Sequence, residues 1–217
     1  MVKIQTYTID SHEAKTDLCV FGETTDKSPH NVWLHYHKHP YTPIYSLLLG
    51  PYRNSLIHFC EIGIAGGDSI KMWRKYFHEN TRIFGMDSSP GFLEMLTEKE
   101  YPNVFPVHVD VTDEEYMCEQ LKNLNTVFDI VVDDSDHLIE SQKKIVKSFL
   151  PFIKPGGMLI IEDVNRSESV SVAEKYEEYF GEELLSLFES IYYIKAEHKN
   201  RFSGDYNNDS LLVFIKK

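Results

Sequence analysis

The sequence predicts an α/β fold whose sheet is mainly parallel and carries helices on both faces. Three observations predict it: short apolar runs alternate with helical stretches from residue 56 onward, a glycine-rich turn follows the first run, and each of the first five runs ends in an acidic residue. Strands separated by helices form right-handed βαβ units, which place helices on both faces of a parallel sheet. The alternation therefore indicates a Rossmann-like sheet of seven strands that closes with a C-terminal antiparallel hairpin.

Each expected element follows from one of these runs. The fourth run, Phe128–Val132, is nearly all apolar, as a central strand buried on both faces should be. The last two strands are joined without a clear helix, through the turn formers Ser203-Gly204-Asp205 and Asn207-Asn208-Asp209, which indicates a hairpin at the edge of the sheet. The strands are expected at 56–62, 81–86, 104–109, 127–132, 157–162, 189–195 and 210–216, and the helices at 42–49, 67–78, 89–98, 113–123, 138–152 and 170–186.

The length suits one domain with an elaborated terminus. We divide the 217 residues into an N-terminal lid or cover segment at 1–50, rich in His, Tyr and Thr, and a main domain at 51–217. A cluster in the first segment has no clean metal-ligand spacing, so we expect lid or surface residues that cover a cofactor or form a substrate wall. Its members are His30, Trp33, His35, Tyr36, His37, His39, Tyr41 and Tyr45.

Charge and cysteine usage narrow the class of protein. A net charge of −12 with no basic block disfavours binding to nucleic acid. No run is long enough to span a membrane, and the N-terminus lacks the apolar core of a signal peptide. Cys19, Cys60 and Cys118 are widely spaced and contain no CxxC pair, which favours reduced thiols, with Cys60 filling the core. We therefore expect a cytoplasmic protein with a small-molecule partner, and leave open whether it forms a homo-oligomer.

The glycine turn Gly63–Asp68 predicts a cofactor site. Glycine lets bare backbone approach a ligand, and Asp87 at the end of the next strand is placed to accept hydrogen bonds from ribose hydroxyls. Ala65 and Asp68 break the six-residue dinucleotide spacing, and the Lys-Ser/Thr of a P-loop is absent from the turn. Glu61 before the turn is awkward for a pyrophosphate but suits the cationic S-adenosylmethionine (SAM). The alternative is a tight turn that only packs a helix on the sheet.

Two acidic loops predict a metal site. Asp133-Asp134-Ser135-Asp136-His137 follows the fourth strand, and Glu162-Asp163 ends the fifth, so their carboxylates should converge at one edge of the sheet. Converging carboxylates need a cation, and oxygen ligands suit Mg²⁺ better than zinc. His137 beside them can serve as a general base. The alternatives are a helix-capping segment with Ser135 or Asp136 as N-cap, and acids solvated on separate loops.

The order of these motifs resembles a known family. Glu61-x-Gly63-x-x-x-Gly67, Asp87, Phe128–Asp134 and Lys154-Pro155-Gly156-Gly157 resemble class I SAM-dependent methyltransferases. Within that class, Asp133–His137 and Ile161–Asp163 resemble the metal-dependent sugar O-methyltransferases of macrolide biosynthesis, the macrocin and mycinamicin type. Thr25-Asp26-Lys27 and His39–Tyr45 resemble that family's opening segment, so the similarity covers residues 24–165.

The resemblance implies a role for each candidate residue. It implies that Asp134, Glu162 and Asp163 bind Mg²⁺ and that His137 is the base. Glu61, Gly63 and Gly67 would hold the methionine part of SAM, Asp87 the ribose, and Asp110 with its neighbours the adenine edge. Ser88, Val111 and Asp133 complete the cofactor-binding set. Two departures stand out: Ala65 replaces a usual glycine, and Asp136 adds a carboxylate that could shift the basicity of His137 or support the metal ligands.

The predicted activity is therefore Mg²⁺-dependent O-methylation of one hydroxyl of a vicinal diol, on a sugar of a glycan or glycosylated metabolite. A catechol would chelate the metal in the same way and stays an alternative acceptor. Two alternatives belong to other classes. A nicotinamide-dependent oxidoreductase is disfavoured by the broken glycine spacing and the terminal hairpin, and a non-catalytic SAM-binding domain by the intact carboxylates and His137.

Overall fold

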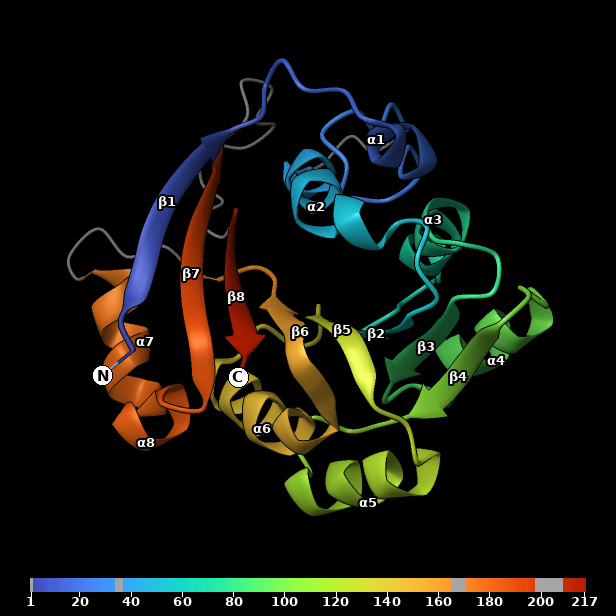
Figure 1. The fold of residues 1–217 in the computed structure, drawn as a ribbon. Helices are drawn as coiled ribbons and strands as arrows, with labels where there is room; N and C mark the ends of the chain where they lie inside the picture. The colour runs from blue at the N-terminus through green and yellow to red at the C-terminus, as the bar shows by residue number, and fades with distance from the viewer. Residues whose placement is uncertain (1, 34–36, 165–170, 198–208) are drawn as a thin grey trace.

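The computed structural model describes residues 2–33, 37–164, 171–197 and 209–217. In these residues one sheet contains eight strands in the order β1-β7-β8-β6-β5-β2-β3-β4 (Figure 1). The strands are β1 (Ile4–Asp10), β2 (His58–Ile62), β3 (Arg82–Asp87), β4 (Val104–His108), β5 (Phe128–Asp133), β6 (Ile153–Ile161), β7 (Phe188–Glu197) and β8 (Ser210–Lys216).

The α/β fold with a mainly parallel sheet and an antiparallel C-terminal pair is confirmed. The run from β6 to β4 is parallel throughout, and β8 is antiparallel to both of its neighbours, β6 and β7. The expected number of seven strands is wrong by one, because residues 4–10 form β1 parallel to β7. The β7–β8 pair is therefore not at the edge of the sheet. The edge strand on that side is β1. The turn residues 203–208 expected between β7 and β8 lie outside the described residues.

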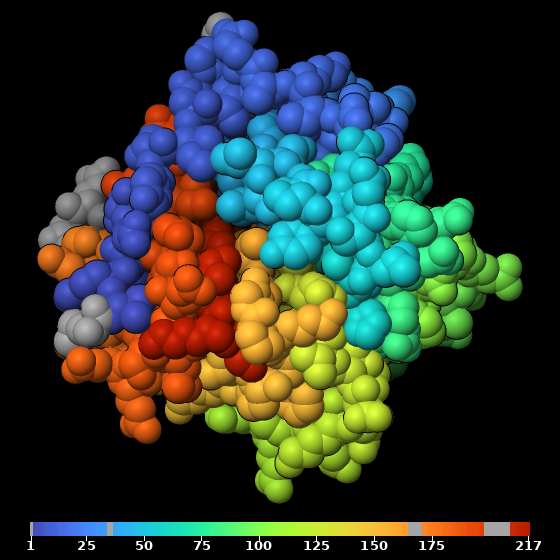
Figure 2. All heavy atoms as spheres, in the orientation of Figure 1, coloured from blue at the N-terminus to red at the C-terminus, as the bar shows by residue number. Residues whose placement is uncertain are grey.

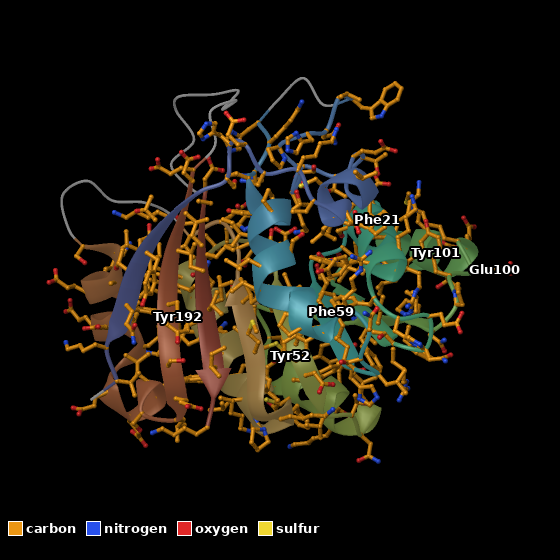
Figure 3. The ribbon with its side chains drawn as sticks, turned by 45° about the horizontal axis from the view of Figure 1, so that its top comes forward. Phe21, Tyr52, Phe59, Glu100, Tyr101 and Tyr192 are labelled. Atoms are coloured by element: carbon orange, nitrogen blue, oxygen red, sulfur yellow. The ribbon has the colours of Figure 1, made fainter. Side chains whose placement is uncertain are left out.

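Helices cover both faces of the sheet, and each face has its own apolar core. Strand residues alternate between the two cores: Cys60 and Ile62 pack with α5–α8, and Phe59 packs with α1–α3. Phe59, labelled in Figure 3, lies with its ring centroid 5.0 Å from that of Trp73. The helices are α1 (Asp17–Phe21), α2 (Tyr41–Leu49), α3 (Asp68–Tyr76), α4 (Pro90–Glu98), α5 (Glu114–Leu124), α6 (Ile139–Phe149), α7 (Val172–Phe180) and α8 (Glu182–Leu185), with 3-10 turns at Gly50–Tyr52 and Leu150–Phe152.

Local sequence explains where several helices begin and end. The side chains of Ser89 and Asp113 accept hydrogen bonds from the amides of Phe92 and Tyr116, and so cap α4 and α5. The helix expected at 170–186 is divided at Gly181, whose φ of 80° is left-handed and ends α7. The predicted core position of Cys60 is confirmed, since its side chain is fully buried.

The N-terminal residues join the main body closely. In Figure 2 their blue and cyan atoms form a continuous surface from β1 across the top of the molecule. Tyr41, Ile44 and Tyr45 of α2 are almost completely buried against the core that contains Trp73. The division at residue 50 stays a prediction, with residues 4–10 a strand of the sheet. None of the described helices has the length and apolar character needed to cross a bilayer.

Candidate active site

The carboxyl ends of β2, β3, β5 and β6 lie side by side, and backbone hydrogen bonds continue the sheet beyond them. The amide of Gly63 donates to the carbonyl of Met86 at 2.8 Å, and that of Asp134 to the carbonyl of Ile62 at 2.8 Å. The amide of Glu162 donates to the carbonyl of Asp133 at 2.9 Å. These bonds bring the glycine turn and both acidic loops together at one edge of the sheet.

The glycine turn has a shape that only glycine fits at position 63. Gly63 has a φ of 83°, and a Cβ there would lie 2.0 Å from the backbone oxygen of Asp134. The next amides, of Ile64 and Ala65, donate to Oδ2 of Asp87 at 3.0 and 3.3 Å. These bonds attach Asp87, the last residue of β3, to the glycine turn.

A first cavity of about 210 Å³ lies beside Asp87. It combines apolar walls with two carboxylates and two serines, which suits a nucleoside. Four predicted cofactor residues line it, namely Gly63, Asp87, Ser88 and Val111, together with Ile62, Val109, Ser135 and Asp136. Asp110 does not line it: its Oδ1 accepts from the hydroxyl of Thr112 at 2.6 Å and from its amide, and these two bonds lower the pKa of Asp110.

A second cavity of about 280 Å³ adjoins the first, with Gly63 lining both. Its walls are Thr24–Lys27 of the N-terminal segment, residues 63–66 of the glycine turn, Asp68, Ser69 and Asp134. Glu61 and Gly67 do not line either of these two cavities. The Glu61 carboxylate is fully buried and accepts from Ser69 Oγ at 2.6 Å and Trp73 Nε1 at 3.0 Å. The φ of 78° at Gly67 turns the chain into α3.

The predicted metal carboxylates lie next to a lysine that the sequence interpretation did not single out as functional. Lys27 Nζ is 2.5 Å from Asp134 Oδ2, 2.7 Å from Glu162 Oε2 and 3.5 Å from Glu61 Oε1. The side chain of Lys27 is only 1% exposed. Glu162 Oε1 accepts from the hydroxyl of Tyr45 at 2.5 Å, and Asp163 Oδ1 accepts from that of Tyr41 at 2.6 Å.

Burial dominates the ionisation of these groups. Burial raises the pKa of Asp134 to about 7, although the Lys27 ammonium opposes the rise, and burial likewise raises the pKa of Glu162. Burial raises the pKa of Asp133 to about 6 against the hydrogen bonds from Ser135. Burial alone would lower the pKa of Lys27, but Asp134 and Glu162 raise it well above its ordinary value, so Lys27 remains an ammonium.

Three residues of this cluster could hold a divalent ion. Asp134, His137 and Asp163 each offer one ligand atom, and the three atoms lie within 4.8 Å of one another. Two carboxylates and an imidazole are donors that bind divalent ions. Glu162 is not part of this set, and its two oxygens accept hydrogen bonds from Lys27 and Tyr45.

His137 and Asp136 have different environments. His137 Nε2 lies 3.6 Å from Asp163 Oδ2, and the side chain is 39% exposed. Asp136 instead accepts from the amide of Leu138 at 3.0 Å and from Ser141 Oγ at 2.7 Å, which forms a turn before α6. The N-cap of α6 is Leu138, so the alternative that Ser135 or Asp136 is the N-cap is wrong. His137 and Asp163 both have left-handed φ values, 58° and 54°, and such strain in non-glycine residues concentrates at functional sites.

The expectation of surface residues is wrong for much of the N-terminal cluster. His37, His39, Tyr41 and Tyr45 are buried. His37 Nε2 and His39 Nδ1 lie 2.8 and 2.9 Å from Asp209 Oδ1, and His39 Nδ1 lies 3.3 Å from Asp163. The spacing of Tyr41, Ile44 and Tyr45 on one face of a helix was a signal that could have predicted their burial.

Two other members of the cluster are described by the structure, and one of them, His30, is half-buried with its Nε2 2.9 Å from the carbonyl oxygen of Ala14. Trp33 is 71% exposed, as expected of a lid or surface residue. His35 and Tyr36 lie outside the described residues.

The strand order, the glycine turn and the carboxylate at the end of the second parallel strand are features of a Rossmann-like fold and are similar to those of class I methyltransferases. The profile of the family described as "Methyltransferase domain" matches residues 60–164. This stretch of the chain is therefore similar to that family, and the resemblance to the macrocin and mycinamicin type is confirmed by individual relatives.

Demethylmacrocin O-methyltransferase of Streptomyces fradiae is 32% identical over 133 residues, which cover 58% of this chain and 32% of the relative. Mycinamicin VI 2''-O-methyltransferase of Micromonospora griseorubida is 27% identical over 136 residues, with coverage of 58% and 32%. The solved structure of MycE methyltransferase with Mg, SAH and mycinamycin VI has a TM-score of 0.56 at 26% identity, covering 69% of this chain and 37% of that one. The chain thus spans about a third of the length of these relatives.

Proposed function

We propose that this chain is a SAM-dependent O-methyltransferase that uses a divalent ion, Mg²⁺ by preference, to methylate one hydroxyl of a vicinal diol on a sugar. The observation that carries the proposal is the convergence of Asp134, His137 and Asp163 beside two cavities that share Gly63. The names of the relatives support the class of acceptor, because they are O-methyltransferases of glycosylated metabolites.

The two cavities suit the two halves of SAM. The first offers the apolar side chains of Val109 and Val111 to the adenine ring and Asp87 to the ribose hydroxyls. The second offers the backbone of residues 63–66 and the carboxylate of Asp134 to the cationic methionine part. Ser88 belongs to the first cavity, whereas Glu61, Gly67, Asp110 and Asp133 would act by holding the turn and the strand ends in shape.

The residues around the acceptor would supply orientation and proton transfer. When bound, SAM supplies an electrophilic methyl group and the divalent ion lowers the pKa of a chelated hydroxyl. Asp134 and Asp163 would hold that ion, and His137 would take the proton of the reacting hydroxyl. Asp163 Oδ2, 3.6 Å from Nε2 of His137, would stabilise the imidazolium that forms.

Substitution of the base tests the mechanism. His137→Ala should leave SAM binding unchanged and lower methyl transfer by roughly 10²–10⁴-fold, the usual contribution of a general base. Transfer of labelled methyl to a panel of glycosides and catechols measures the rate, and calorimetry measures cofactor binding. His58→Ala, at the start of β2 and away from the site, is the matched control. A His137→Ala variant with full rate would refute the base.

Removal of the ion tests the metal. We expect EDTA to stop turnover and Mg²⁺ to restore it, while the affinity for SAM stays within about threefold. Undiminished turnover in chelator would exclude a metal-assisted reaction.

A further inference from the structure

Lys27 stands out because it is a completely buried cation contributed from outside the methyltransferase domain. Its ammonium lies within 3.5 Å of three carboxylates, those of Asp134, Glu162 and Glu61. These acids come from the ends of three neighbouring strands, whereas Lys27 lies in the connection between α1 and α2. A single side chain therefore neutralises the inner part of the acidic cluster.

The backbone around Lys27 is fixed, so the position of the ammonium is built into the fold. The carbonyl of Lys27 accepts from the amides of Tyr41 and Thr42 at 3.1 and 3.0 Å, at the start of α2. The amide of Lys27 donates to Thr25 Oγ1 at 3.2 Å, and the carbonyl of Asp26 accepts from the amide of His39 at 2.7 Å. Because these hydrogen bonds fix the backbone of Lys27, they also restrict the position of its ammonium group.

Asp134 connects this inner cluster to the outer one. Its Oδ2 accepts from Lys27, and the same carboxylate belongs to the set of ligand atoms with His137 and Asp163. A divalent ion in the outer set would thus share Asp134 with the ammonium and lie close to it. Like charges a few ångströms apart inside a protein repel strongly.

We propose that Lys27 is the internal counter-cation of the metal centre: it is a positioning residue that holds Glu162 and Asp134 in place without an ion and weakens the binding of a divalent ion at Asp134 and Asp163. This inference rests on the metal binding of the proposed function. It assigns Glu162 to the lysine, and it makes the N-terminal segment a determinant of metal affinity. Without the Lys27 ammonium, these buried carboxylates would need a metal ion to balance their charge.

The affinity for Mn²⁺ tests the inference without any turnover. Mn²⁺ bound to the whole chain without SAM is measured by electron paramagnetic resonance of the free ion. Lys27→Met keeps an unbranched side chain that is one atom shorter and removes its charge, and should tighten Mn²⁺ binding at least tenfold. Lys154→Met removes the same charge from a lysine 2.7 Å from Asp129 at the opposite end of β6, and should change the affinity less than about twofold.

Two further measurements separate charge from shape and from folding. Lys27→Arg keeps a cation and should bind Mn²⁺ within about threefold of the wild type. Lys27→Met should melt at a lower temperature than the wild type in chelator, and saturating Mn²⁺ should raise its Tm by more than it raises that of the wild type. If Lys27→Met folds only with Mn²⁺, the inference is supported, because the ion then replaces the lysine.

The outcomes that overturn the inference differ from those that overturn the proposed function. An unchanged or weaker Mn²⁺ affinity in Lys27→Met, beside a wild type that binds Mn²⁺, refutes the role of Lys27 alone. Equal tightening by Lys27→Arg refutes a charge effect. If neither wild type nor Lys27→Met binds Mn²⁺, both this inference and the metal-dependent mechanism fail.

Discussion

Gly63 links the two halves of the candidate site at the scale of one residue. It lines both cavities, and its missing Cβ lets the backbone of Asp134 approach. Because Asp134 also contacts Lys27, the position of this one glycine affects cofactor binding and the acidic cluster together. The left-handed φ of 83° adds a second reason why only glycine fits.

Gly63→Ala should therefore disrupt the fold locally. We expect it to lower the free energy of unfolding by at least about 2 kcal/mol, since the new Cβ meets backbone and the φ angle is strained. Urea denaturation provides the measurement. The control is Gly50→Ala, where φ is −50° and no atom lies within 4 Å of the added Cβ. That substitution should be neutral or stabilise by up to about 1 kcal/mol, and a similar loss in both variants would contradict the role of Gly63.

Individual residues differ in how far the sequence predicted them. Acids that follow parallel strands converge for a topological reason, so Asp134 and Asp163 could be placed without coordinates. Lys27 could not be placed, because it meets Asp134 and Glu162 across 107 and 135 positions and no local pattern encodes such a contact. The hydrogen bonds of Glu162 with Lys27 and Tyr45 could not be predicted either, because they also join residues far apart in the sequence.

The element that most changes the expected architecture is β1. It pairs with β7 in parallel along its whole length, and Tyr7 packs against Tyr192, which is labelled in Figure 3. Glu177 of α7 attaches the beginning of this strand, since its carboxylate accepts from the amide of Ile4 at 2.8 Å and from Lys3 Nζ at 2.7 Å.

The attachment through Glu177 should depend on pH. Although burial opposes it, the hydrogen bonds from Lys3 and Ile4 lower the pKa of Glu177 below its ordinary value of 4.5. A carboxyl with a lowered pKa in the folded state stabilises the protein above the unfolded value of 4.5 and loses this contribution as the pH falls through the folded value.

Glu177→Gln should accordingly lower the free energy of unfolding by roughly 0.5–1 kcal/mol at pH 7 and by almost nothing near pH 3. Glu178→Gln, which removes the same charge from an exposed neighbour on α7, should have no such pH-dependent effect. Denaturation at both pH values measures the difference. An equal loss at pH 7 and pH 3 would show that the carboxylate charge does not matter.

Elements with strong periodicity were predicted well, and β1 was not. The expected strands at 210–216 and 104–109 coincide with β8 and β4 to within a residue, because their apolar residues face a core. Along β1 only Ile4 is fully buried and most other side chains are exposed. A strand held at a sheet edge chiefly by backbone hydrogen bonds has no apolar pattern to reveal it, although Thr, Tyr and Ile in residues 4–9 favour extended backbone.

At the scale of the whole molecule, the two cavities lie at the carboxyl ends of the parallel strands. The N-terminal strand β1 and the C-terminal strands β7 and β8 belong to the same sheet. Binding of a cofactor product should therefore stabilise the folded chain as one unit. S-adenosylhomocysteine at a hundred times its dissociation constant contributes about 2.7 kcal/mol. For a chain of this size each kcal/mol raises Tm by about 2–4 °C, so we expect an increase of roughly 5–10 °C.

NAD is the matched ligand for that experiment, because it carries the same adenosine with a pyrophosphate. It should leave Tm unchanged in differential scanning fluorimetry. A larger increase with NAD than with S-adenosylhomocysteine would favour an oxidoreductase and contradict the methyltransferase.

The salt bridge between Lys27 and Glu162 also constrains how such a chain can evolve. If one buried ammonium balances the inner acids, a mutation that removes either partner alone leaves an uncompensated charge in the interior. Descendants without a basic residue at position 27 should therefore have exchanged one of these acids for a neutral side chain, or should depend on a permanently held metal. Positions 27 and 162 are expected to covary among homologous chains.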